Sequence, residues 1–239
     1  MPASNVTIEA SSSGGCVTPD TLVTLADGTQ KRIDSVSADE LLLVWDFYKG
    51  EYAAVPASIL VNHGRGVYTI ATLTFSDGTE VNTINGHGFF HEESNQFIVL
   101  NEENAADYIG DSFLKQDGDG FASVTLVDVT IEKKEEESWG ILTAVHYNCF
   151  LEGMLTMTDA EVPGTPGYLM PFEIGEGMKY DEEKMQADIE QYGLYTYDEF
   201  ADYCTYEQFV GFGIDKFKVS VAKGYITWEG ILFMLSLYG

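Results

Sequence analysis

Positive charge is scarce in this sequence. Its 239 residues carry 12 Lys and Arg against 39 Asp and Glu, which gives a formal net charge of −27. Proteins bind nucleic acids and anionic lipid surfaces through clusters of basic side chains that neutralise phosphates, and this balance provides no such cluster. The composition therefore disfavours nucleic-acid binding and indicates a strongly acidic, solvated surface.

Cysteine is scarce as well. The sequence has three cysteines, Cys16, Cys149 and Cys204, without a CxxC pair or a histidine at zinc-like spacing. An odd count argues against a disulfide framework, and the missing spacings argue against a structural metal, so we expect no metal and no cofactor. Sparse cysteine fits a cytosolic protein or a secreted or cell-surface bacterial protein.

Long hydrophobic runs are missing. The longest mainly apolar stretch, Ile231–Leu237, is far too short to cross a bilayer, so we expect no membrane span. Residues 1–4 show no basic and apolar signal-peptide regions. Aromatic residues, by contrast, are plentiful, and 14 Tyr and 14 Phe supply a core that needs no disulfides.

Strand-like runs fill the first two thirds of the chain. Thr21–Leu25 leads into an Asp-Gly turn at Asp27, and Thr72–Phe75 leads into another at Asp77. Each is a hairpin signal, and the two segments align as one β unit used twice. The acidic stretch Glu135–Glu137 is predicted to be a solvated loop. Five further strands are predicted: Leu41–Phe47, Val67–Ala71, Gly88–Phe90, Gln96–Leu100 and Ala122–Ile131. So many short strands predict a mainly β domain.

The character of the sequence changes near Asp159. The cluster Pro163–Gly167 is typical of a linker, and helical patterns follow it. We expect a small, mostly α domain over residues 159–239, of unknown role. Helix starts are predicted at three threonines: Thr196 with Glu199, Thr205 with Gln208, and Thr227 before a helix over Trp228–Tyr238.

The first segment that contains a candidate reactive group is Gly14–Gly28, with the sequence GGCVTPDTLVTLADG. A thiol is a soft nucleophile that can attack a neighbouring carbonyl, and Gly15 before Cys16 has no side chain to block the approach. The alternative is a small buried thiol at a strand start.

Two more segments supply histidines. The segment Asn82–Phe90 reads NTINGHGFF and contains His87, and a well-placed general acid is worth about 10²–10⁴ in rate. A structural, hydrogen-bonded His87 is the alternative. The segment Ser138–Thr158 contains His146, Asn148 and a turn at Gly153. His63 and His91 are expected in surface loops, and Cys149 is expected to point into the core.

In this order, the three segments resemble the motifs of the Hint domain, the self-processing module of inteins and hedgehog C-terminal regions. The resemblance implies an upstream flank (residues 1–15) and a Hint domain with pseudo-twofold duplicated β structure (residues 16–158). It also implies that Cys16 attacks the carbonyl of Gly15 and converts the Gly15–Cys16 amide into a thioester. The resemblance assigns the remaining roles as follows: His87 protonates the amide nitrogen, Thr83 or Asn85 supports it, His146 assists transfer, and Asn148 and Gly153 shape the C-terminal turn.

The sequence departs from the family pattern at several positions. Ile84 stands where Thr is usual, Gly88 replaces Pro, and Gly140 replaces Asp. Inteins end in His-Asn and release their C-terminal flank by cyclising that Asn, whereas this chain has Met157–Thr158 and continues. Thr158 cannot cyclise in this way, so full splicing is not expected.

The resemblance therefore implies N-terminal cleavage or acyl transfer. The substrate would be the protein's own N-terminal flank, and the acceptor would be water, a thiol, an amine or an alcohol. The alternative is a Hint fold whose chemistry has decayed and which serves as a structural or interaction module of a bacterial surface protein.

Overall fold

The protein is described from a computed structural model, which covers residues 15–47, 49–57, 59–143, 146, 148–158, 178–179, 181–211, 213–224 and 227–237. Residues 1–14 of the expected flank, and the expected domain boundary and linker within 159–177, lie outside the described residues. The strands are β1 (Cys16–Val17), β2 (Leu22–Thr24), β3 (Gln30–Arg32), β4 (Leu41–Asp46), β5 (Glu51–Pro56), β6 (Ile59–Phe75), β7 (Glu80–Ile84), β8 (His87–His91), β9 (Gln96–Leu100), β10 (Ser112–Asp117), β11 (Gly120–Leu142), β12 (Asn148–Leu151) and β13 (Met154–Met157). The α-helices are α1 (Glu182–Tyr192), α2 (Tyr206–Gly211), α3 (Phe217–Ala222) and α4 (Trp228–Leu237).

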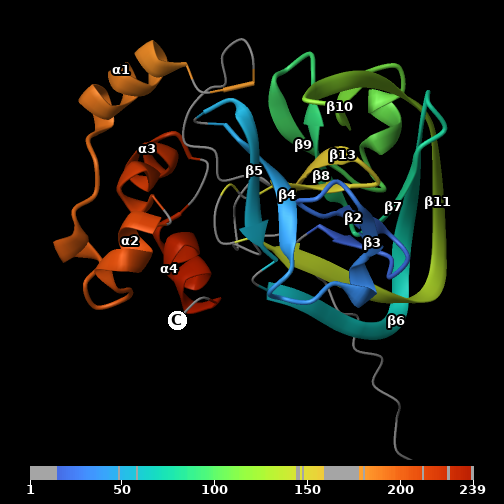
Figure 1. The fold of residues 1–239 in the computed structure, drawn as a ribbon, viewed down its shortest axis with the longest axis horizontal. Helices are drawn as coiled ribbons and strands as arrows, with labels where there is room; N and C mark the ends of the chain where they lie inside the picture. Colours follow the sequence, from blue (N-terminus) through green and yellow to red (C-terminus); the bar gives the residue numbers. More distant parts are fainter. Residues whose placement is uncertain are drawn as a thin grey trace, which may run out of the picture.

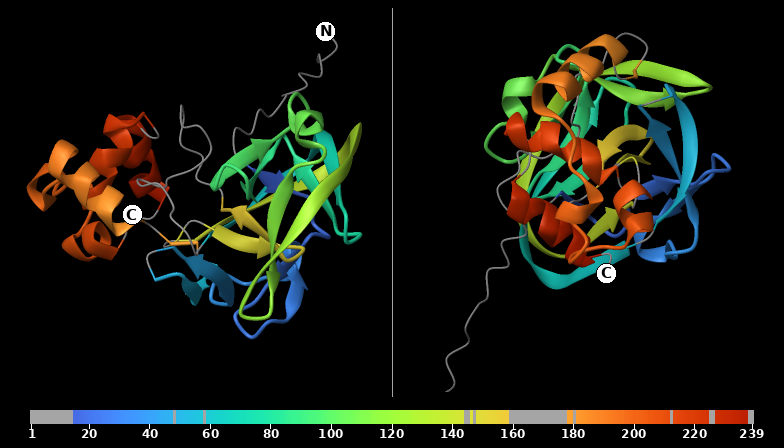
Figure 2. Two further views of the ribbon diagram at one scale, coloured as in Figure 1. Left: turned by 90° about the horizontal axis from the view of Figure 1, so that it is seen from above. Right: turned by 90° about the vertical axis from the view of Figure 1, so that its left-hand side faces the viewer.

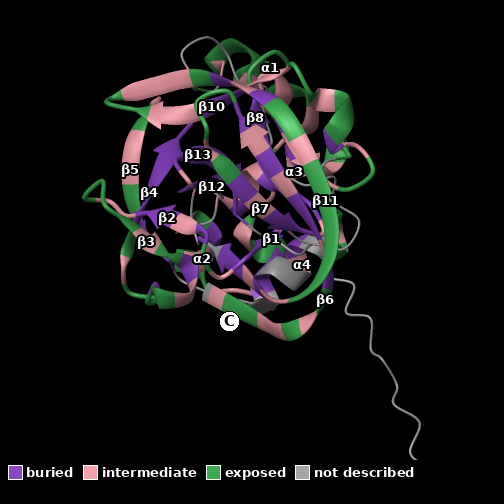
Figure 3. Ribbon diagram, turned by 90° about the vertical axis from the view of Figure 1, so that its right-hand side faces the viewer, coloured by how far each residue is buried: buried purple, intermediate pink, exposed green. Residues whose placement is uncertain are grey.

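The expected mainly β architecture with a small helical region is confirmed (Figure 1). Within the described residues, one sheet of 11 strands runs in the order β1-β7-β6-β11-β10-β8-β13-β12-β2-β3, with β9 paired to β8, and β4 and β5 form a ribbon of their own. The long strands β6 and β11 pair along most of their length at the outer side of the sheet. In Figure 3 the short central strands are largely buried, while β6 and β11 carry exposed residues along their length.

The duplicated hairpin is confirmed in detail. In both turns the Asp carboxylate accepts hydrogen bonds from the backbone N–H and the hydroxyl of the Thr two residues later, at 2.9 and 2.6 Å for Asp27 and 3.0 and 2.9 Å for Asp77. Gly28 and Gly78 then take φ values of +82° and +87°, which only glycine adopts without strain. One turn joins β2 to β3 and the other joins β6 to β7.

The prediction of a solvated loop over Glu135–Glu137 is wrong. These residues lie in β11 and pair with Arg65–Val67 of β6. Glu135 is exposed and the next two side chains are partly exposed, so the charges reach water while the backbone groups stay paired. High charge therefore does not interrupt a strand whose side chains face solvent.

The helical region has its own apolar cluster. The expected cap at Thr205 is confirmed, since its hydroxyl accepts from Gln208 N–H at 3.2 Å. Thr196 forms the expected capping box with Glu199, but the helical segment that it starts is only a single 3₁₀ turn, Tyr197–Glu199. Helix α4 follows Thr227 as expected. The buried members of the cluster are Phe200, Phe209, Ile214, Phe217, Ile231 and Leu235.

The helices gather on one side of the strands (Figure 2). Val219 of α3 belongs to the same buried cluster as Phe90 and Phe97, and Ile189 of α1 packs against that cluster. The indole N–H of Trp45 also donates to the carbonyl of Met178 at 2.5 Å. No helix in the described part of the chain has the length and apolar character that a membrane span requires.

Candidate active site

The Gly15–Cys16 junction stands at the start of the shortest strand, between two longer ones. Cys16 pairs with Ile84 of β7, and Val17 pairs with both Thr83 of β7 and Trp139 of β11. Cys16 is fully buried, with an exposed fraction of 0%. Residues far apart in the sequence therefore surround the bond that the sequence analysis singles out.

The side chain of Cys16 points away from Val17, as alternation along a strand requires. It packs in a small buried cluster with Tyr68, Ile70 and Ile84. The three cysteines form no disulfide. The thiol therefore sits in a dry setting beneath the sheet, next to the bond it would attack.

His87 lies directly against Gly15. A Cβ atom added to Gly15 would lie 2.2 Å from His87 Nδ1, so only glycine leaves room for the ring. The approach follows from the tight turn after β7, where Asn85 and Gly86 take φ values of +55° and +95°. Cys16 pairs with Ile84, the last residue of β7. The turn after Ile84 therefore brings His87, the first residue of β8, back to the start of β1.

The imidazole of His87 is uncharged at neutral pH. Burial lowers its pKa to about 4, and the nearby backbone groups of Gly15 and Met157 only partly oppose this effect. Neither ring nitrogen has a hydrogen-bond partner of normal geometry among the described residues. A buried polar ring without partners of normal geometry is uncommon, so the surroundings of His87 differ from those of an ordinary core residue.

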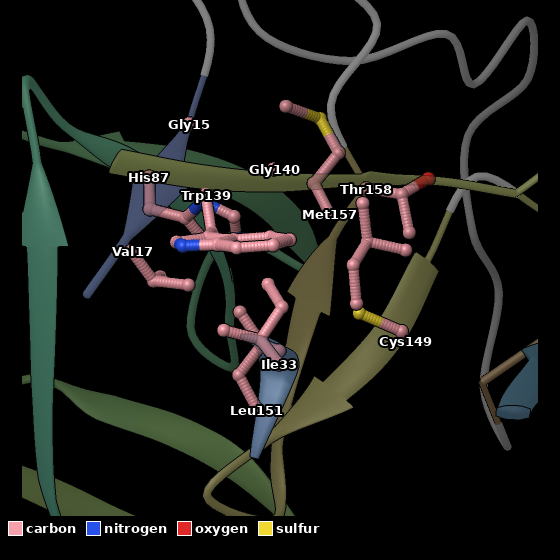
Figure 4. A pocket seen from close by; sticks show the side chains of 11 residues that line it. Gly15, Val17, Ile33, His87, Trp139, Gly140, Cys149, Leu151, Met157 and Thr158 are labelled. Atoms are coloured by element: carbon pink, nitrogen blue, oxygen red, sulfur yellow. The ribbon is translucent and has the colours of Figure 1, made fainter. Parts of the chain in front are cut away.

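A small cavity of about 10 Å³ opens beside Gly15 and His87 (Figure 4). Its wall is mainly apolar, and in Figure 4 Cys149 lies on the opposite side from Gly15 and His87. The lining residues are Gly15, Val17, Ile33, His87, Trp139, Gly140, Ile141, Cys149, Leu151, Met157 and Thr158.

Thr83 and Asn85 are not among the residues that line this cavity. Thr83 is fully buried in β7 and its hydroxyl donates to the carbonyl of Ala71 at 3.3 Å. Asn85 lies in the turn before His87, where its backbone N–H donates to the carbonyl of Thr69. The structure thus places both residues in or directly after β7, next to the motif, and the Thr83 hydroxyl is bonded to Ala71.

Comparison with solved structures decides the fold. A variant of the Ssp DnaB mini-intein superposes with a TM-score of 0.53 at 14% identity, covering 62% of this chain and 97% of that one. The DnaB intein from Synechocystis sp. gives a TM-score of 0.52 at 14% identity, covering 60% and 98%. The DnaX mini intein from Spirulina platensis gives 0.50 at 14%, covering 60% and 99%.

This chain has the Hint fold. The sequence itself matches no family model and no curated protein. Because the identity to the solved inteins is low, the shared fold is what these matches establish, and the chemistry has to be argued from the residues.

The C-terminal motif of the Hint domain is held by Asn148. Its side-chain oxygen accepts from Trp45 N–H at 2.7 Å, and its amide donates to the carbonyls of Trp45 at 2.9 Å and His146 at 2.7 Å. Gly153 takes φ +79° in the turn between β12 and β13 and its carbonyl accepts from Gln116 N–H at 2.8 Å. Both positions shape this end of the sheet.

His146 is outside the cavity beside Gly15. Its Nδ1 lies 3.9 Å from Asp46 Oδ1, and its backbone takes φ +73°. Burial lowers its pKa, Asp46 opposes that shift, and Lys49 adds to it. The structure therefore does not bring His146 together with Gly15 and His87.

The sequence analysis did not place three of the lining residues at the site. Trp139 reaches the cavity because it pairs with Val17, and its buried Nε1 has no partner among the described residues. Thr158 lines the cavity, and its hydroxyl lies 3.2 Å from that of Thr143. Cys149 is buried as expected, and burial raises its pKa to about 12, so it remains a thiol. The alternation of β11 is the one sequence signal that points Trp139 toward the site.

The expectations for His63 and His91 are wrong. His63 lies within β6. His91 is buried at the end of β8, with Nδ1 2.8 Å from Ser94 Oγ and Nε2 3.2 Å from Asp111 Oδ2. Across the described residues, no group of three or more His, Cys, Asp or Glu side chains is arranged to hold a metal ion.

Proposed function

We propose that this Hint domain converts the Gly15–Cys16 amide into a thioester and so releases or transfers its N-terminal flank. The Cys16 sulfur adds to the carbonyl carbon of Gly15, and the C–N bond then breaks. The products are an acyl group on the Cys16 sulfur and a new α-amine on the same residue.

The contact between His87 and Gly15 carries this proposal. The ring occupies the space that any side chain at position 15 would fill, so it lies beside the amide whose nitrogen has to be protonated. A proton donor at that position is what the leaving amine requires. Tight surrounding packing also holds the reacting groups in place, which reduces the entropic part of the barrier.

The low pKa of His87 determines where the proton comes from. With a pKa of about 4 the ring is neutral near pH 7, so it has no extra proton to give at the start. In the proposed path the Cys16 thiol gives up its proton to solvent as the C–S bond forms, on the other side of β1 from the ring. The ring passes a proton taken from solvent to the amide nitrogen, so no net proton is consumed.

Cleavage without splicing follows from the end of the domain. Thr158 stands where inteins carry the terminal Asn, and it has no side-chain amide to cyclise. Its hydroxyl is instead close to that of Thr143. The chain also continues into the helical region.

A reporter protein fused before residue 1 tests the proposal. The fusion is incubated near pH 7 with or without dithiothreitol or hydroxylamine, and the fragments are weighed by mass spectrometry. We expect a fragment ending at Gly15 that Cys16→Ala abolishes. Cys204→Ala, in the helical region, is the matched control and should cleave like the unaltered protein. Cleavage after Gly15 that persists in Cys16→Ala would falsify the proposal.

The second candidate is a Hint fold that serves only as a structural or interaction module. Two observations favour it: His87 is uncharged at neutral pH, and Gly140 provides no carboxylate where the family has one. A folded protein that releases no fragment ending at Gly15, with or without dithiothreitol or hydroxylamine, would support this function instead.

A further inference from the structure

The cavity beside Gly15 combines an apolar wall with unpaired polar atoms. Nδ1 and Nε2 of His87 and Nε1 of Trp139 are buried and have no hydrogen-bond partner of normal geometry among the described residues, although backbone groups of Gly15 and Met157 lie near the His87 ring. Burying such an atom without a partner lowers the stability of the folded protein. Buried polar groups of this kind are usually satisfied by an internal water that makes two to four hydrogen bonds.

The size of the cavity limits what can enter. Its volume is about 10 Å³, close to the roughly 10–15 Å³ that a single water needs. Ile33, Leu151 and Met157 close the apolar side, and all three are buried. A cavity of this size holds about one water, and a dithiol, an amino acid or a sterol alcohol would have to displace its lining side chains.

We propose that water is the acceptor of this Hint domain, and that it acts from this cavity, where His87 and Trp139 Nε1 position it. The inference rests on the proposed thioester at Cys16. It selects one acceptor from the four chemical classes that the sequence leaves open. Trp139 is a positioning residue in this scheme.

The chemistry balances without a further reactant. The water oxygen adds to the acyl carbon of Gly15 while neutral His87 takes one of its protons. The C–S bond to Cys16 then breaks, the departing sulfur takes a proton from solvent, and the ring gives its proton back to solvent. The products are a Gly15 carboxyl group on the released flank and a free Cys16 thiol.

The arrangement of β1 separates the entering and leaving groups. Gly15 and Val17 line the cavity, whereas the Cys16 side chain packs on the other side with Tyr68 and Ile70. The water therefore does not compete with the leaving sulfur for space.

The test uses the full chain with its upstream reporter, incubated in ¹⁸O-labelled water with a series of nucleophiles. Water, hydroxylamine, glycine and dithiothreitol increase in size, and mass spectrometry distinguishes their products. We expect one ¹⁸O in the Gly15 carboxyl group, with little product from glycine or dithiothreitol. Thioester formation is measured separately, by unfolding samples in acid and trapping the acyl group with hydroxylamine.

Two variants act on the cavity itself. Trp139→Phe removes the Nε1 donor but keeps the ring, and should lower the rate of hydrolysis relative to thioester formation about tenfold, the effect of one lost hydrogen bond. Met157→Ala enlarges the cavity and should raise the share of dithiothreitol product about tenfold, since about 1.4 kcal/mol of relieved crowding corresponds to that factor.

Matched controls come from elsewhere in the protein. Trp45→Phe removes an indole donor that serves Met178, and Met154→Ala opens a different buried cluster. Neither should change the ratio of hydrolysis to transfer. If the unaltered protein reacts with dithiothreitol as readily as Met157→Ala does, the water proposal is overturned while the thioester proposal stands. If no acyl group can be trapped after unfolding, both are overturned.

Discussion

Gly15 precedes the thiol and lies against a buried imidazole, so its lack of a side chain has a direct structural reason. The separation of 2.2 Å between an added Cβ and His87 Nδ1 is shorter than any real contact. Either the ring or the start of β1 would have to move. The position is therefore constrained by the ring as well as by the approach of the sulfur.

Gly15→Ala should reduce thioester formation by about tenfold or more, because a displacement near 1 Å can cost up to about 10²-fold in rate. The measurement is hydroxylamine trapping at fixed times. Gly120→Ala is the control, since a Cβ there meets nothing within 4 Å and should leave the rate unchanged. Equal rates for both variants would contradict the contact between Gly15 and His87.

His87 also predicts how stability depends on pH. Its pKa is lowered from 6.5 to about 4 in the folded protein, so the unfolded chain binds the proton more readily. The stability from this site is fully present above pH 6.5 and is lost as the pH falls through 4. The loss should be roughly 3 kcal/mol, at about 1.36 kcal/mol per pKa unit.

Denaturant unfolding at several pH values measures this loss. His87→Gln should remove most of the slope between pH 6.5 and pH 4. His63→Gln, on the partly exposed face of β6, should keep it. A slope that is unchanged in His87→Gln would mean that other groups cause the pH dependence.

At the scale of elements, the sequence predicts what depends on local chemistry. The two Asp-Gly turns, the strand Gln96–Leu100 and the helix start at Thr205 all follow from nearby residues, and the structure has them. Cys16, His87 and the glycine that precedes Cys16 were also predictable as candidate site residues, because each belongs to a local motif.

Long-range pairing was not predictable in the same way. The acidic part of β11 was expected to be a loop because a run of charged residues is typical of solvated loops. Its partner strand, β6, lies far away in the sequence, so no neighbouring residue indicates the pairing. Trp139 faces the cavity only because β11 pairs with β1 at Val17. His91 is buried because Asp111 and Ser94 are brought to it by the fold. No local pattern in the sequence specifies these long-range partners, and the alternation along β11 indicates only which residues share a face with Trp139.

Asn148 connects two elements that are remote in the sequence. It pairs with both backbone groups of Trp45 in β4, from its position at the start of β12. Asn148→Ala should lower the free energy of unfolding by about 3 kcal/mol, since it leaves buried backbone groups unsatisfied.

The matched control for Asn148 is Asn62→Ala. Asn62 is exposed on β6 and its side chain accepts a single hydrogen bond, from Gly64 N–H. Its loss should cost less than about 1 kcal/mol because water replaces the bond. Denaturant titration of both variants tests the contrast. Equal costs would argue that the hydrogen bonds between Asn148 and Trp45 do not stabilise the fold.

At the scale of the whole molecule, the helices and the strands share a buried cluster. Val219 and Ile189 pack with Phe90 of β8, the strand that begins with His87. The helical region thus supports the far end of the strand that carries the proposed proton carrier. This packing links its integrity to the position of the ring.

The excess of acidic groups should make the molecule less stable at low salt. With a net charge of −27, repulsion between surface carboxylates opposes the compact state, and salt weakens that repulsion.

Lys133 and Glu135 provide a matched pair, because both are exposed on β11 two residues apart. Glu135→Lys changes the net charge from −27 to −25, and Lys133→Glu changes it to −29. At low salt the first should raise Tm and the second lower it, each by roughly 2 °C, and both differences should shrink above about 0.5 M salt, where the Debye length is a few ångströms. Thermal unfolding at both salt concentrations measures these shifts, and shifts that do not depend on salt would mean that local contacts in β11, rather than the overall charge, set the effect.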